Sequence, residues 1–488
     1  MKRFILYISL LLSTSVSAQT RLTLTDAISI AQKQSLSAMV ARLNFMSSYW
    51  SNRSFKAEFL PAVNLSGELM QYNHSTVEAR NAETGVINMV DNNSLTNSLT
   101  LSVDQNISAL GGTLSVQSYL YRLDQFNEKS KTYNSQPLRL QYAQPLFAFN
   151  SLKWQKKTEP LKYEKAKRQY LETQESVTNN VVLLFFNVLS AQSEAEQSKA
   201  NLEDRERLFE MAKKRLALGT TTKGDVLQLE LSLINARVTA KEKGLALSSA
   251  RFALRNYLML PPQTEVELIA PMDVPQIVLS EPEVIVKALA NSTFAQKQKL
   301  STLEAEKAVA QAKAARGIQM KVTADVGFNR TANYLRDAYR GLENSQVVGV
   351  SVSMPIFDWG ESRGRVRMAE ADLEAVKTSN KQEYEQYVQD IRTSVMRFNM
   401  QNDQCSAALR AQEIATERYE ITRKRFEAGG VTVTDLNTAW QEAESARASY
   451  IAQLQTYWSS YYSLRKTTLY DWITNRDLTT DYNSLINE

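Results

Sequence analysis

Two short segments in the second half of the chain alternate apolar and polar residues. Residues 348–356 place five apolar side chains on one face and small or polar ones on the other, and residues 322–329 follow the same pattern. A period of two over about nine residues predicts β-strands. Such strands suit a membrane, with one face toward lipid and the other toward a lumen, and they equally suit a half-buried sheet in a soluble protein.

The pattern after these strands is helical and unusually long. Between Glu361 and Ala428 there is no proline and a single glycine, Gly364. A helix of about 64 residues, rising about 1.5 Å per residue, would reach about 95 Å. This length exceeds that of a globular domain, and a seam of apolar steps of three and four needs partner helices beside it. The seam consists of Val366, Ala369, Leu373 and Val376, followed by Val388, Ile391, Val395 and Phe398.

Landmarks of the first half return in the same order in the second half. Gln144-Pro145-Leu146-Phe147 returns as Met354-Pro355-Ile356-Phe357, at an offset of 210 residues. Matched landmarks in matched order predict an internal twofold repeat. The same offset relates Lys214-Arg215, Gly219, Thr222 and Asp225 to Lys424-Arg425, Gly429, Thr432 and Asp435.

Each copy is predicted to contain a helix, a β region, a long helix, a tight turn and a second long helix. The first copy covers residues 19–260 with its β region at 61–147, and the second covers 283–470 with its β region at 320–357. Five prolines between Pro261 and Pro282 predict an extended linker over 261–282. Residues 471–488 are predicted to form a polar C-terminal tail.

The start of the chain has the pattern of an export signal, predicted over residues 1–18. Lys2 and Arg3 precede an apolar run, and Val16-Ser17-Ala18 offers small residues for cleavage. We find no later run of 18 apolar residues, so no membrane helix is predicted. The exported protein is therefore either soluble beyond the inner membrane or held in an outer membrane by β-strands.

Composition excludes several kinds of chemistry. The leader holds two of the 57 basic residues and no acidic one, which leaves 55 basic against 52 acidic residues, too small an excess to predict a nucleic-acid partner. With a single histidine, His74, and a single cysteine, Cys405, the chain cannot form a Cys/His zinc site or a disulfide framework. Because no nucleophile–base pair or phosphate-binding glycine loop is recognisable, we expect neither an enzyme nor a cofactor.

The number of strands bears on how the chain assembles. The first copy has candidate strands around Val63–Leu69 and Leu138–Tyr142, which with the second copy gives about four per chain. Four strands cannot close a barrel, and an open edge cannot face hydrocarbon. In a membrane, several chains must therefore share one barrel; eight strands would be filled by side chains, whereas twelve strands from three chains would leave room for water.

The chain resembles the TolC-type outer-membrane efflux protein family. The resemblance covers nearly all of the mature chain and rests on the double copy and on three motifs in their order and spacing. These motifs are Gln144-Pro145-Leu146-Phe147 leading into Ser151-Leu152-Lys153-Trp154, then Phe185-Phe186-Asn187-Val188-Leu189, and the two Arg-x-x-x-Gly turns, Arg215 to Gly219 and Arg425 to Gly429.

The resemblance implies an α+β fold: a trimeric β-barrel in the outer membrane with about four strands per chain and twelve in all, continued by a periplasmic α-helical coiled-coil barrel. It also implies a passive exit duct of an efflux or type I secretion system. The implied partners are two sister chains, outer-membrane lipid, a periplasmic adaptor protein and an inner-membrane transporter of the RND or ABC type. One departure from the family is an extra strand pair near residues 95–126, expected as a hairpin at the outer face or beside the barrel.

The two turns are the candidate working site. Arg215 and Arg425 suit the last helical turn, where a cation meets the helix dipole, and Gly219 and Gly429 suit a left-handed stop. Thr222 with Asp225, and Thr432 with Asp435, resemble capping boxes. These residues could serve only to turn the chain; the resemblance implies instead a periplasmic tip where the pore closes and the adaptor docks. Thr438 stands where a second acidic residue would complete a double ring, so a double ring is not expected.

Aromatic residues mark the points where strands hand over to helices. Phe147, Phe357 and Trp359 are expected at the periplasmic edge of the membrane, although packing at a junction would also account for them. A pore-free periplasmic coiled-coil tether remains an alternative function. Heat-modifiable migration on gels and pore conductance would separate the two, because a tether shows neither.

Overall fold

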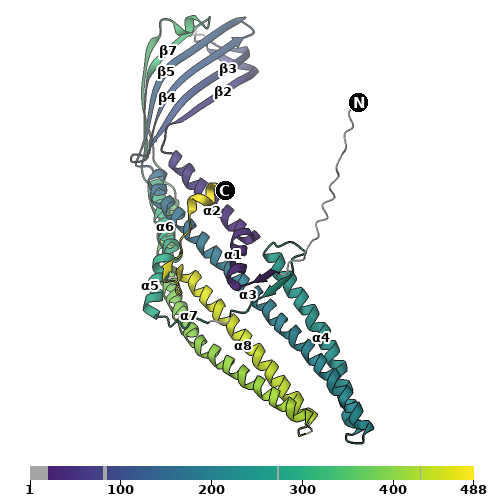
Figure 1. The fold of residues 1–488 in the computed structure, drawn as a ribbon. Helices are drawn as coiled ribbons and strands as arrows, with labels where there is room; N and C mark the ends of the chain where they lie inside the picture. Colours follow the sequence, from purple (N-terminus) through teal and green to yellow (C-terminus); the bar gives the residue numbers. More distant parts are fainter. Residues whose placement is uncertain (1–19, 81–84, 272–273, 429, 488) are drawn as a thin grey trace, which may run out of the picture. The chain divides into compact units, whose positions relative to one another are not determined.

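The structure is a computed structural model that describes residues 20–80, 85–271, 274–428 and 430–487 (Figure 1). The predicted signal at 1–18 and the predicted turn residue Gly429 lie outside the described residues. The chain divides into two compact units, and each contains segments of both repeats. One unit combines residues 47–166 and 296–383, and the other combines 1–46, 167–295 and 384–488.

The first of these units, the sheet unit, is built around one antiparallel sheet (Figure 1). Within the described residues its order is β2-β3-β4-β5-β7-β8. The strands are β2 (Ala62–Arg80), β3 (Ile87–Ile107), β4 (Gly112–Gln125), β5 (Ser130–Leu146), β7 (Gln319–Ala332) and β8 (Glu343–Ser353). A short 3₁₀ helix, η1 (Asp337–Tyr339), lies between β7 and β8 in the sequence.

The sequence prediction needs correction at the extra strand pair. β3 and β4 lie inside the sheet, between β2 and β5, so each chain contributes six strands to the sheet rather than about four. The pair is not an outer hairpin: the β3–β4 turn is held by Asn150, whose Nδ2 donates to the Ser108 carbonyl over 2.9 Å, and by Gln144, whose Nε2 donates to the Leu110 carbonyl over 2.7 Å. An inserted antiparallel pair keeps the direction of both neighbouring strands, which is why the sheet accommodates it.

The sheet is irregular at three places where its register shifts. These are between Glu68 and Gln71 in the β2–β3 pair, between Gln117 and Tyr119 in β4–β5, and between Ser135 and Arg139 in β5–β7. Pro137 lies within the third irregularity, where a residue without an N–H donor costs no ladder hydrogen bond. Such bulges bend and twist a sheet, as a barrel wall requires.

The second unit, the helical unit, contains two long helical hairpins. They are formed by α3 (Ser151–Ala217) with α4 (Lys223–Tyr257) and by α7 (Glu361–Glu427) with α8 (Val433–Thr468). The unit boundary falls inside α3 and α7. Shorter elements complete the chain: α1 (Leu24–Gln34), α2 (Leu36–Ala57), α5 (Glu281–Asn291), α6 (Phe294–Arg316), α9 (Tyr482–Asn487), and the short strands β1 (Thr20–Leu22), β6 (Val266–Leu268), β9 (Tyr470–Asp471) and β10 (Arg476–Asp477).

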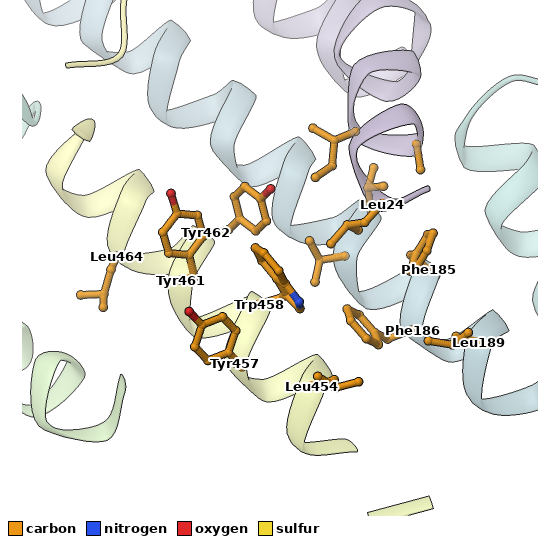
Figure 2. Packing of buried hydrophobic residues seen from close by; sticks show 14 of the residues in the cluster. Leu24, Phe185, Phe186, Leu189, Leu454, Tyr457, Trp458, Tyr461, Tyr462 and Leu464 are labelled. Carbon is orange, nitrogen blue, oxygen red and sulfur yellow. The ribbon is translucent and has the colours of Figure 1, made fainter. Parts of the chain in front are cut away.

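The core of the helical unit joins both repeats. Figure 2 shows Trp458 of α8 directed toward Phe186 of α3, and both belong to one buried cluster with Leu24 of α1. Phe186 and Tyr457 are fully buried, and Cys405 of α7 lies in the same cluster. Each large aromatic side chain that is fully buried stabilises the fold by about 1.5–3 kcal/mol. This cluster therefore anchors the hairpins.

The linker and the tail pack against this core. β6, within the predicted linker, pairs in parallel with β1, from Thr20 opposite Val266 to Leu22 opposite Leu268. Asn399 of α7 clamps the linker backbone at Leu279, donating to its carbonyl over 3.0 Å and accepting from its N–H over 2.9 Å. The tail is anchored by Tyr482, whose hydroxyl donates to the Lys167 carbonyl over 3.3 Å. In the described part of the chain, none of the helices has the hydrophobic length of a bilayer-spanning segment.

Candidate functional site

The turn between α3 and α4 ends one helix and starts the next within a few residues. Gly219 has φ +69° and nothing within 4 Å of a Cβ at its position, so it provides a left-handed stop without contact. The N–H of Gly219 donates to the Leu216 carbonyl and that of Thr220 to the Arg215 carbonyl, both over 3.0 Å. This is the Schellman arrangement, which satisfies the last carbonyls of a helix.

The start of α4 is closed by a reciprocal cap. The N–H of Asp225 donates to Thr222 Oγ1 over 3.1 Å, and the N–H of Thr222 donates to Asp225 Oδ2 over 3.1 Å. The Thr222 hydroxyl also donates to the same carboxylate over 2.6 Å. These hydrogen bonds from Thr222 lower the pKa of Asp225, so the carboxylate is ionised at neutral pH and occupied by the cap.

The turn between α7 and α8 repeats this chemistry. The N–H of Asp435 donates to Thr432 Oγ1 over 3.2 Å, and the N–H of Thr432 donates to Asp435 Oδ2 over 2.9 Å. Hydrogen bonds from Thr432 lower the pKa of Asp435, with a smaller contribution from the positive charge of Arg425. The N–H of Gly430 donates to the Arg425 carbonyl over 2.8 Å, as in the first turn.

The two hairpin ends contact each other. Arg215 Nη2 donates to the Glu427 carbonyl at the end of α7 over 2.9 Å. A small core below them includes Leu208, Val226, Phe426 and Leu436, one from each of the four long helices. The structure therefore brings Arg215 against the second turn, whereas the sequence pattern indicated only a helix-terminal cation.

A partly buried polar cluster between α3 and α7 was not predicted from the sequence. The Tyr419 hydroxyl donates to Asp204 Oδ2 over 3.1 Å, and Arg423 Nη1 approaches the same oxygen at 3.9 Å. Burial and the neighbouring Asp204 raise the pKa of Tyr419 to about 12, so the phenol stays protonated and available as a donor. A cavity of about 160 Å³ adjoins the cluster, lined in part by Asp204, Arg205 and Met211.

Arg205 lies beside this cluster and is only partly satisfied. It is 5% exposed, and its Nε donates to Asn201 Oδ1 over 3.2 Å, while its Nη1 is buried without a hydrogen-bond partner among the described residues. Burial lowers the pKa of the Arg205 guanidinium. A buried charge that is only partly satisfied destabilises the packing around it, so this part of the coil is a weak point of the helical seam.

The heptad spacing contained a signal for this cluster. Leu208 and Ala212 lie on a buried seam, and extending its steps of three and four backward places Ser198, Asn201 and Arg205 on it. Three consecutive polar residues at seam positions are unusual in a coiled coil. The second repeat differs, because Ile414 and Ala415 stand 210 residues after Asp204 and Arg205.

A groove lies along the second hairpin. It is lined by apolar Ile414, Ile421 and Val431 and by Arg425, Asp435 and Thr438 near the turn, with Glu417 and Arg418 beside them. Its volume is about 530 Å³. An apolar floor with a charged rim can hold one face of an amphipathic helix.

The predicted aromatics occupy the strand-to-helix junctions of the sheet unit. Phe147 is 73% exposed, Phe357 72% and Trp359 91%. These side chains therefore do not belong to a core within the described chain. The rings of Phe357 and Trp359 pack edge to face with centroids 4.7 Å apart. Phe147 and Trp359 adopt φ of 61° and 53°, and exposed side chains on such constrained backbone remain available to another surface.

In the part of the chain that the structure describes, no group of three or more His, Cys, Asp or Glu residues could hold a metal ion. His74 instead pairs with Asp91, Nε2 to Oδ1, over 3.1 Å.

Known structures share this fold at low sequence identity. The Campylobacter jejuni CmeC outer membrane channel is 16% identical with a TM-score of 0.65, and the match covers 95% of this chain and 88% of that chain. The outer membrane protein VceC of Vibrio cholerae is 15% identical with a TM-score of 0.62, covering 93% and 97%. The open state of the Neisseria gonorrhoeae MtrE outer membrane channel is 15% identical with a TM-score of 0.60, covering 94% and 91%.

A search of curated proteins finds no significant match. The model of the family described as "Outer membrane efflux protein" matches residues 109–258 and 284–468, most of the chain. The match includes both long hairpins, both capped turns and four of the six sheet strands in whole or in large part. Together with the alternating strands and the long helical seams, this shows that the chain belongs to the outer membrane efflux protein family.

Proposed function

We propose that three copies of this outer-membrane efflux channel form one conduit. In this proposal the helical hairpins project into the periplasm, and their tips both close the pore and bind a periplasmic adaptor protein. An inner-membrane transporter of the RND or ABC type supplies the cargo and the energy. The channel itself is a passive exit duct of the efflux machine.

The open edges of the sheet carry the proposal. Within the described residues, β2 and β8 each have one strand neighbour and are the two outer strands of the sheet. Unpaired backbone N–H and C=O groups cost several kcal/mol each in hydrocarbon. Pairing β8 of one copy with β2 of the next removes both edges, and a ring of three such pairings closes a barrel.

An exposed stripe on α4 supports the same assembly. Leu227, Leu231, Ile234 and Val238 follow steps of four, three and four residues, and each is more than half exposed. The stripe continues at intervals of seven with Leu245 and Phe252. This is the spacing of a coiled-coil seam without its partner helix. We assign the partner to a neighbouring copy, because α4 already buries its opposite seam of Val226, Leu229 and Leu233 within its own chain.

The hairpin tips have the features of a closable end. Arg215 ties the first hairpin to the end of α7, and the Asp204–Tyr419 hydrogen bond ties α3 to α7 further along. Opening the tip would require these links to break while each hairpin keeps its own capped turn. Each of the three chains contributes one Asp435, so threefold assembly would place three carboxylates near the entrance and attract cations.

The groove on the second hairpin is our candidate for adaptor docking. Ile414, Ile421 and Val431 offer apolar contact, and Arg425 and Asp435 offer charges of both signs near the turn. An adaptor that presents the tip of a helical hairpin would bury apolar side chains in this groove, and the charges near the turn would fix its orientation. The exposed aromatics Phe147, Phe357 and Trp359 are proposed to meet outer-membrane lipid at the interfacial level, where such rings accumulate.

Planar-bilayer recordings test the conduit and its gate together. Purified protein should migrate as a heat-modifiable oligomer and form pores, and Arg215→Ala or Tyr419→Phe should raise the single-channel conductance because each removes a link between the two hairpins. Thr479→Ala, at an exposed position in the C-terminal segment, would serve as the control. Absence of pores would contradict the channel, whereas pores with unchanged conductance in both variants would contradict only the gate.

A further inference from the structure

The strands β3 and β4 have the length of membrane strands. They contain 21 and 14 residues, and about 9–11 residues suffice to cross a bilayer. Their ladder runs from Ile107 opposite Gly112 to Ser94 opposite Gln125. β4 pairs with β5 over almost its whole length, from Thr113 opposite Ala143 to Gln125 opposite Ser130. The pair is therefore a full-height part of the sheet.

The apolar face of the sheet continues across the inserted pair. Val63, Val103, Val116, Leu140 and Val326 stand opposite one another in a single row over five neighbouring strands. All five side chains are exposed in the single chain, between 36% and 69%. A row of exposed aliphatic side chains across five strands is what a lipid-facing wall presents.

The opposite face is polar and is also continuous. Asp104 of β3 accepts hydrogen bonds from Asn64 of β2 over 3.0 Å and from Ser115 of β4 over 2.6 Å. On the same face Gln117 Nε2 of β4 donates to Gln141 Oε1 of β5 over 3.3 Å. Arg139 of β5 then donates to Asp325 of β7 over 2.8 Å and 3.0 Å. The polar side chains of β3 and β4 thus belong to the same network as those of the strands that both repeats share.

We propose that β3 and β4 are part of the channel wall, so that three chains close an eighteen-stranded barrel with Ser102, Asp104 and Gln117 facing its lumen. The inference rests on the proposed trimer. Barrel diameter grows roughly linearly with strand number, and barrels of 16–18 strands hold an aqueous channel. The outer section is then about one and a half times as wide as that of a twelve-stranded barrel, which fits large water-soluble cargo and leaves the tip as the narrow point.

Cysteine labelling in the assembled protein tests which way the inserted strands face. The variants Ser102→Cys and Gln117→Cys, each with one introduced cysteine, are compared with their neighbours Leu101→Cys and Val116→Cys, using a charged, membrane-impermeant methanethiosulfonate. The natural Cys405 is 3% exposed, and the unsubstituted protein gives its background. On β8, Ser351→Cys and Val350→Cys form a reference pair.

The expected result is rapid labelling of the Ser102 and Gln117 variants, with a fall in conductance, and protection of the Leu101 and Val116 variants. If the β8 pair shows this contrast and the β3–β4 variants do not, the inserted pair lies outside the wall and the inference is overturned while the channel stands. If the β8 pair also lacks the contrast, the barrel itself fails, and the inference with it.

Polymer exclusion compares the pore width of the natural protein with that of a variant that lacks β3 and β4. Neutral polyethylene glycols of increasing size, added on the outer side, lower the conductance as long as they enter the barrel. Deleting residues 87–125 lets β2 pair directly with β5, because Val63 and Leu140 lie in the same row. The cutoff diameter should fall by about a third in that variant. An equal cutoff in two assembled proteins would contradict a wall that contains β3 and β4.

Discussion

The two repeats agree closely at their turns and differ at their strands. Thr222 with Asp225 and Thr432 with Asp435 form the same reciprocal cap with nearly the same distances. By contrast, the first repeat contributes four strands to the sheet and the second contributes two. A tight turn tolerates few alternatives, whereas an antiparallel sheet accepts two more strands without disturbing its neighbours.

The largest expected effect comes from placing a charge on the apolar face of either repeat. Leu101→Arg on β3 and Val350→Arg on β8 should each cost about 2–4 kcal/mol per chain in the membrane. Because the barrel contains the substitution three times, both variants should lose the heat-modifiable oligomer. Migration on gels after outer-membrane extraction measures this loss.

The adjacent positions are the matched controls for this comparison. Ser102→Arg and Ser351→Arg place the same charge on the polar face and should retain the oligomer. A tolerated Leu101→Arg beside a disruptive Val350→Arg would show that the two repeats do not contribute equally to the wall.

The next effect concerns the asymmetric part of the coil. Tyr419→Phe removes a hydrogen bond to a carboxylate, worth about 1.5–3 kcal/mol, and should shift the ratio of open to closed channels by at least about tenfold. Open probability in planar bilayers measures it. Thr416→Ala, at an exposed position on the same helix, should leave the open probability unchanged.

The turns themselves should respond equally. Thr222→Ala and Thr432→Ala each remove a capping hydroxyl and should destabilise their helix start by about 1 kcal/mol. Hydrogen exchange of the first turns of α4 and α8 reports this directly, and Thr→Ser at either position, which keeps the capping hydroxyl, should leave protection unchanged. Loss of protection at one turn alone would show that the two caps do not contribute equally to stability.

The pH dependence of the caps follows from the lowered pKa values of Asp225 and Asp435. A carboxylate whose pKa is lower in the folded protein stabilises it above the usual value near 3.8. That contribution is lost as the pH falls through the folded pKa. Hydrogen exchange at the starts of α4 and α8 should therefore become faster as the pH falls below the usual aspartate pKa.

A buried carboxyl in the helical unit gives a second pH-dependent test. Burial raises the pKa of Glu175 to about 7, against the opposing charge of Arg465. A raised folded pKa means that stability falls as the pH rises between the usual value of 4.5 and about 7. Glu175→Gln should remove the pH dependence of the thermal unfolding midpoint over this range. Glu385→Gln, at an exposed site, should leave that pH dependence unchanged.

Much of the fold was predictable because it rests on local periodicity. The seam from Val388 to Phe398 and the landmarks around Gly219 depend on residues close in sequence, and the structure places α7 and the first turn where these patterns lie. The insertion of β3 and β4 was misplaced because alternation defines faces but not the order of strands. Both strands alternate correctly whether they lie within the sheet or beside it.

The candidate site was predictable only in part, for a related reason. The caps join residues three positions apart, whereas the Asp204–Tyr419 bond joins residues 215 positions apart. Nothing in the local pattern around Asp204 indicates Tyr419, although Asn201 and Arg205 on the seam did indicate a polar interruption. Contacts between repeats depend on how the two hairpins pack, and periodicity does not specify that packing.

Cryo-electron microscopy of the protein in lipid nanodiscs would show directly how many chains and strands surround one barrel. We expect three chains around one water-filled barrel, with β8 of each chain paired to β2 of the next and eighteen strands in the wall. A single chain whose sheet closes on its own, or an assembly whose sheet edges stay unpaired, would contradict the shared conduit and the function built on it.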